Sequence, residues 1–180
     1  MTTTFAQEIE LLKTNRYIEL FKIDTVVIGG GDIFYITPNV YTTTKVYFGG
    51  NPYDPFPVQA QGFERNGSTT APAQPTLTVS NLSRFFMASI LNLGDMVGAK
   101  VTRYRTFMNF LDGQADADTS ATYSPDVYII MQKSMHTKST IQWTLCSQLD
   151  RPDVRLPRRQ ILRDQTTNGL FAPGCGISRV

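Results

Sequence analysis

The sequence predicts a mainly β domain, with antiparallel, barrel-like strands, two short helices and an extended C-terminal arm. Apolar and polar residues alternate in the second half of the chain, and glycine- and proline-containing segments separate the apolar runs. Ile141, Trp143 and Leu145, for example, alternate with Gln142 and Thr144. Strict alternation is typical of a strand with one solvated face, as in antiparallel sheets. It also predicts that Trp143 lies in the core.

Two segments have the apolar spacing of an amphipathic helix. Thr4 and Gln7 form a capping-box pattern, and Phe5, Ile9 and Leu12 recur at helical spacing, so a helix is expected over residues 5–13. A second helix is expected over 81–91, where the apolar positions are Leu82, Phe85, Phe86 and Ile90.

The other apolar runs are expected to be strands. Residues 17–28 and 33–36 flank Gly29-Gly30-Gly31-Asp32, which predicts a hairpin; no GxGxxG or GxxxxGK[ST] motif supports a phosphate-binding loop. Further strands are expected over 44–48 and 76–80 and around 102–110, 127–131 and 141–145. In the 102–110 strand, Arg103 and Arg105 are expected on the polar face.

Residues 49–75 form a connector with five prolines and four glycines. Because proline cannot donate to a ladder, we expect at most residues 58–63 of it to pair in the sheet. Long connectors in compact chains are usually functional. We therefore expect this segment to contact another subunit more than its own core, with Tyr53, Phe56 and Phe63 as aromatic anchors.

The chain is expected to divide into a β domain, residues 1–150, and an arm, residues 151–180. Residues 100–180 hold eleven Lys/Arg against seven Asp/Glu, and five of these arginines lie between residues 151 and 163. Arg155, Arg158 and Arg159 are the candidates for pairing with carboxylates of a neighbouring subunit. A solvated basic edge and contacts lining a DNA-conducting lumen are the alternatives.

No catalytic or metal-binding set is visible. His136, the only histidine, lies in a predicted turn, whereas a Ser–His–Asp site needs a rigidly held histidine. Asp112, Asp116 and Asp118 lack the spacing of a calcium loop. Two cysteines and one histidine cannot form a four-ligand metal site within one chain. Cys146 is expected to be a buried free thiol, and a disulfide to Cys175 is the less favoured alternative.

The N-terminus lacks the pattern of a secretion signal, and no apolar run approaches the roughly 20 residues of a membrane helix. We therefore expect a soluble protein made in a cytoplasm.

Residues 46–82 carry a resemblance to a known family. The elements Tyr53-x-Pro55-Phe56-Pro57-Val58, Gly62-Phe63-Glu64, Asn66-Gly67 and the run from Pro75 to Leu82 follow one another in order. Together they resemble the minor tail protein L family of lambda-like siphophages. Residues 96–112 and the hairpin near the N-terminus are also similar, so the resemblance covers roughly residues 17–150.

The resemblance implies a structural subunit of a long-tailed phage, with no enzymatic activity. Such a subunit belongs to a tail-tip or baseplate hub ring, is typically a homotrimer, and joins the distal tail protein to the central tip (host-specificity) protein during assembly and DNA delivery. Other minor tail proteins are further expected partners; a membrane and sequence-specific nucleic acid are not. The expected location is the tail tip of the virion, and the host cytoplasm during assembly. The alternatives are a distal tail ring protein and a cell-wall hydrolase of the tail tip.

The family's C-terminal portion is cysteine-rich and associated with an iron–sulfur cluster. This sequence ends at Val180 and has only Cys175 in that region. We therefore expect no cofactor; whether Cys175 joins cysteines of a partner is left open.

Overall fold

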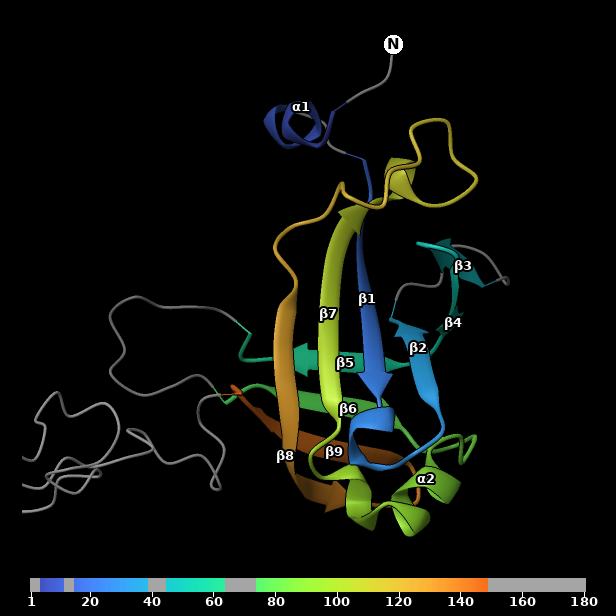
Figure 1. Ribbon diagram of the computed structural model, residues 1–180, viewed down its shortest axis with the longest axis vertical. Coiled ribbons are helices and arrows are strands. Elements are labelled where there is room, and N and C mark those ends of the chain that lie inside the picture. The colour runs from blue at the N-terminus through green and yellow to red at the C-terminus, as the bar shows by residue number, and fades with distance from the viewer. Residues whose placement is uncertain (1–3, 12–14, 39–44, 64–73, 149–180) are drawn as a thin grey trace, which may run out of the picture.

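The computed structural model describes residues 4–11, 15–38, 45–63 and 74–148 (Figure 1). Within them, nine strands form one sheet: β1 (Tyr17–Asp24), β2 (Ile33–Thr37), β3 (Val46–Phe48), β4 (Asn51–Pro55), β5 (Val58–Gln61), β6 (Thr76–Ser80), β7 (Lys100–Phe107), β8 (Asp126–His136) and β9 (Thr140–Cys146). Their order in the sheet is β3-β4-β2-β1-β7-β8-β9-β6-β5.

The pairs are antiparallel apart from β2 with β4, so the prediction of a mainly antiparallel β fold is confirmed. The sheet is open between β3 and β5, so it is barrel-like only in a loose sense. β1, β7 and β8 run along the long axis, whereas β5, β6 and β9 cross them (Figure 1). β8 spans both halves, and its register shifts twice against β9. Such bulges bend a strand and let the sheet fold over a core.

The main core lies between the two halves of the folded sheet. Trp143 is fully buried there together with Ile141 and Leu145, which confirms the face predicted for this strand. A second apolar cluster lies on the other side of β1, where Ile18 and Leu20 pack against the short β3–β4 pair. β1 therefore buries both of its faces.

The N-terminal helix is short and is held by aromatic contacts. α1 (Phe5–Glu10) begins with the predicted capping box, in which the Thr4 backbone N–H donates to Gln7 Oε1 at 3.0 Å. The Phe5 ring packs against the rings of Phe107 and Tyr123, with centroids 5.8 and 5.1 Å apart. These contacts fix α1 over the end of β7.

The second helix begins later than predicted. α2 (Met87–Asn92) follows a turn in which the Arg84 N–H donates to the Asn81 carbonyl at 3.1 Å. Arg84 has a φ of 52°, which an α-helix does not allow, so the helix cannot begin before it. Among the described residues, no helix is long and apolar enough to cross a membrane.

Three further predictions about strand limits are corrected. The first strand ends at Asp24, and residues Val26–Ile28 form a 3-10 turn, η1. β7 ends at Phe107, before another such turn, η3 (Met108–Phe110). β4 pairs in the sheet although it contains Pro52 and Pro55. Proline removes one donor only, and the neighbouring Phe56 N–H reaches the Thr37 carbonyl at 2.9 Å.

Candidate interaction surfaces

The aromatic residues of the connector pack largely onto their own chain. Tyr53 is 2% exposed in the second core cluster, and its ring centroid is 5.2 Å from that of Tyr35; burial raises the pKa of its hydroxyl. Phe63 is 8% exposed and meets Tyr128 edge to face at 5.3 Å. Tyr53 and Phe63 therefore pack in the core of their own chain. The prediction that they contact another subunit more than their own core does not fit the structure. The alternation of residues within the strand could have placed Tyr53 inward. Tyr53 pairs with Val46 of the neighbouring strand β3, which is also buried.

Phe56 is the anchor that keeps exposed surface. Its ring is half-buried against Phe85 and Phe86, with both centroid distances 5.6 Å. Phe85 is itself partly exposed, so the two rings share an apolar surface. The predicted interface role of Phe56 stays a prediction, and this neighbourhood supports it.

Beside Phe63 lies a group of charged residues that the sequence did not reveal. Arg103 was expected on a solvated face but is 9% exposed, with its guanidinium carbon 4.6 Å from the centre of the Phe63 ring. The Arg103 guanidinium lies 3.6 Å from Glu19 and 3.7 Å from Asp126. Arg105 also approaches Asp126, at 3.4 Å. An arginine tolerates this position because its planar group stacks on an aromatic ring while facing carboxylates.

These four residues, the charge cluster, tie the sheet together across β1, β7 and β8. Two arginines face two carboxylates, so the formal charges balance. A cavity of about 610 Å³ opens beside the cluster and is also lined by Gly62 and Ser124. At the end of β1, burial and the Glu19 carboxylate raise the pKa of Tyr17. The arrangement holds charge in place, and it presents no pairing of a nucleophile with a general base.

A second surface, at the α2 end of the molecule, is apolar. Leu82 is 80% exposed and Leu91 is 73% exposed, although both lie within the helix predicted over residues 81–91. Val26 and Val27 in η1, together with Val97 after η2 (Gly94–Met96), are also exposed, and the Gly30 backbone after η1 lies against the Leu93 side chain after α2. Exposed apolar residues that gather at one end of a molecule are candidates for protein–protein contacts. We call Leu82, Phe85, Leu91, Val26, Val27 and Val97 the apolar end.

The apolar end was not predicted from the sequence, because the helix expected over residues 81–91 was expected to bury its apolar side chains along one face. Phe86 and Ile90 are buried as expected, but Leu82 and Phe85 precede α2 and point outward from the turn. Gly30 and Gly98 bring η1 against this region: a Cβ on Gly30 would approach the Leu93 side chain to 2.7 Å.

His136, the residue considered for catalysis, does not form a catalytic arrangement with its described neighbours. His136 is exposed at the end of β8, where its Nδ1 is 3.3 Å from the Lys133 amine and its Nε2 is 3.5 Å from the Asn81 amide nitrogen. Neither neighbour is a carboxylate that would orient it or a nucleophile that it would activate.

The acidic loop carboxylates stabilise the loop. Asp112 accepts a hydrogen bond from the Gly50 N–H at 2.7 Å. Asp118 accepts two hydrogen bonds from Ser120, and these lower the pKa of its carboxyl. In the described part of the chain, no group of three potential metal ligands occurs.

Comparison with known proteins decides the family. The family model described as phage minor tail protein L matches residues 26–178. The chain belongs to the phage minor tail protein L family. It is therefore a structural protein of a phage tail and not an enzyme. The match extends past residue 150, so the family resemblance reaches further than the sequence motifs indicated, and it includes Cys175.

Tail tip protein L of Escherichia phage lambda is 26% identical to this member of the family over 166 residues, which are 89% of this chain and 71% of the relative. A chain from the virion of a native gene transfer agent particle has a similar fold, with a TM-score of 0.57 and 14% identity. That similarity covers 94% of this chain, which spans 55% of the solved chain.

Part of the predicted site lies outside the described residues. Arg155, Arg158 and Arg159, Cys175 and the division between a domain ending at residue 150 and an arm belong to this part of the sequence. Their roles stay predictions. Cys146 lies in β9 and is buried, in agreement with the sequence analysis.

Proposed function

We propose that this tail protein is a ring-forming subunit of the tail-tip hub, present as a homotrimer. In this role it joins the distal tail protein to the central tip protein during assembly, in the host cytoplasm, and during DNA delivery. The family match supports the proposal most directly.

The surfaces of the described residues suit such a role. A ring subunit needs contact surfaces held in a fixed relative orientation on a rigid frame, because the rotation between copies decides whether the ring closes. The charge cluster and the main core supply the rigidity, and the apolar end supplies surface that the monomer leaves exposed. Phe56, at the edge of the same region, and the arginine arm are the further contacts that we propose.

We also propose that the 180 residues carry no iron–sulfur cluster. A cluster of the kind held by cysteines takes four thiolates, whereas this sequence has two cysteines, one of them buried in β9. Iron and acid-labile sulfide are expected at background level in the anaerobically purified chain. Stoichiometric iron and sulfide would contradict this and would point to ligands shared between copies.

Deletion of the gene from the phage that carries it tests the hub proposal. We expect tails that lack the central tip protein and cannot infect, and recovery when the chain is supplied in trans. If tails without the chain still retain the central tip protein, the joining role is wrong. If instead the distal tail ring itself is missing, the chain acts as the distal ring protein, which is the alternative.

A further inference from the structure

A second cavity lies beside the apolar end, between the turn that precedes α2 and the β8–β9 hairpin. Its volume is about 780 Å³, and it is lined by Asn81, Arg84, Met87, His136, Thr137 and Lys138. We call it the hairpin cavity. Its lining contains two cationic side chains, Arg84 and Lys138, and no carboxylate. The nearby Lys133 is already paired with Asp95, so the uncompensated positive charge belongs to Arg84 and Lys138, both exposed.

Asn81, which lines the hairpin cavity, ties the turn before α2 to the β8–β9 hairpin. The side chain is buried, and its Nδ2 donates to the Thr137 carbonyl at 2.9 Å. Its Oδ1 is buried and accepts no hydrogen bond from any described residue. The exposed cations Arg84 and Lys138 suit the cavity to a ligand that carries carboxylates, such as an acidic surface of another protein chain.

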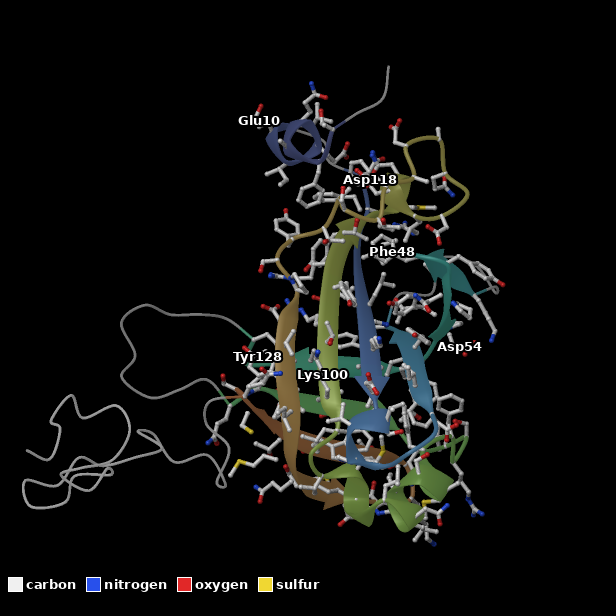
Figure 2. All side chains as sticks on the ribbon, in the orientation of Figure 1. Glu10, Phe48, Asp54, Lys100, Asp118 and Tyr128 are labelled. Carbon is white, nitrogen blue, oxygen red and sulfur yellow. The ribbon has the colours of Figure 1, made fainter. Side chains whose placement is uncertain are left out.

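This chain has exposed carboxylates at its other end. Glu10, Asp116 and Asp118 are carboxylates of α1 and of the loop after η3; Glu10 and Asp118 are exposed and Asp116 is half-buried. Figure 2 shows Glu10 and Asp118 at the end of the long axis opposite α2. We call these three residues the acidic end. Ile9 and Leu11, at the same end, are exposed apolar residues.

We propose that the acidic end of one copy docks in the hairpin cavity of the next copy, so that copies join head to tail. Opposite charges then meet across the contact, which favours this orientation over tail-to-tail pairing. Ile9 and Leu11 of one copy would cover Leu82 and Leu91 of the other, and both pairs are exposed in the single chain. A heterologous contact of this kind closes into a ring when the rotation between copies allows it. This inference rests on the proposed ring function.

A charge exchange tests the contact. The cavity variant is Arg84→Glu/Lys138→Glu, and the acidic-end variant is Glu10→Lys/Asp116→Lys. The quadruple variant carries all four changes and so restores opposite charges in the reversed sense. All four positions lie at the surface or are half-buried. Thermal unfolding followed by circular dichroism checks that each variant folds. Arg84→Gln/Lys138→Gln replaces the cavity variant if that one does not fold.

Each variant gene replaces the original in the phage, and the amount of this chain in purified tails is measured by immunoblot beside the plaque titre. We expect each double variant to lower both by at least about tenfold, and the quadruple variant to return both close to the original level. Two folded double variants that assemble normally would overturn the head-to-tail contact. Loss in the cavity variant alone, without recovery in the quadruple variant, would also overturn it, in favour of an acidic segment of another tail protein.

The same experiment separates this inference from the proposed function. If the unaltered chain is absent from tails, the ring function itself fails. If the unaltered chain is present and all variants behave like it, only the head-to-tail contact fails.

Discussion

Trp143 shows how one side chain organises the core. The residue is fully buried, meets Phe86 edge to face at 5.7 Å, and donates from Nε1 to the Asp95 carbonyl at 3.2 Å. That hydrogen bond links β9 to η2 and so to the base of the apolar end.

Trp143→Ala is expected to lower the free energy of unfolding by ~3–5 kcal/mol, because it removes the largest buried side chain and leaves a cavity. Trp143→Phe, which keeps much of the volume, is the matched control and should lose less. Urea unfolding followed by circular dichroism is the measurement, since the only tryptophan has then been removed as a fluorescence probe. A neutral Trp143→Ala would mean that this face of β9 does not form the core.

Arg103 allows a sharper test, because its side chain is more deeply buried than that of Arg105. The Arg103 side chain is 10% exposed and that of Arg105 is 28% exposed. Arg103→Ala is expected to cost ~3–5 kcal/mol, since it leaves two carboxylates without their central cation. Arg105→Ala should cost clearly less, because solvent screens the more exposed group. If chemical denaturation shows equal losses of unfolding free energy for the two variants, the contribution of each arginine does not depend on how deeply it is buried.

Among elements, the strands were easier to predict than the turns. The alternation around Trp143, the glycine-containing turn before β2 and the capping box before α1 are local signals, and the structure contains all three. The start of α2 depends on the positive φ of Arg84, and the pairing of β4 depends on distant neighbours. Neither leaves a signal in the local spacing of residues.

The candidate surfaces also combine features that the local sequence indicates with features that only the fold creates. The sequence indicated aromatic residues in the connector, but burial of Tyr53 and Phe63 depends on which strands the connector meets. The charge cluster combines residues from β1, β7 and β8, and the apolar end combines turns far apart in the chain. Such groupings arise only from the topology.

The apolar end makes a prediction about assembly. Leu82→Ser/Leu91→Ser should leave the free energy of unfolding within about 0.5 kcal/mol of the original, because both side chains are already in solvent. The same change should reduce incorporation into tails, because it removes apolar contact area. Tyr47→Ser, at an exposed position on the edge strand β3, is the control and should assemble normally. Unchanged incorporation of the double variant would rule out the apolar end as a contact surface.

The arginine arm is the second element with an expected effect on assembly. Arg155→Ala/Arg158→Ala/Arg159→Ala should leave the isolated subunit folded but prevent assembly of the tail tip, because the guanidinium groups would no longer pair with a neighbour's carboxylates. Purified tails and the rate of DNA release are the two readouts. Normal tails with altered release would place these arginines along the DNA path instead.

At the scale of the whole molecule, the sheet folds over its own core without its two edge strands pairing. The two ends of the molecule differ in chemistry. The α2 end carries the apolar end and the two cations of the hairpin cavity. The carboxylates of Glu10 and Asp118 lie at the opposite end (Figure 2). A chain with complementary ends along one axis is suited to repeated contact with copies of itself.

A density map of the intact tail tip tests the hub proposal most directly. Three copies of this chain are expected in a closed ring, between the distal tail protein and the central tip protein, with the α1 end of each copy against the α2 end of the next. A tip in which the chain is absent from this position, or in which it forms the distal ring itself, would show that the hub proposal is wrong.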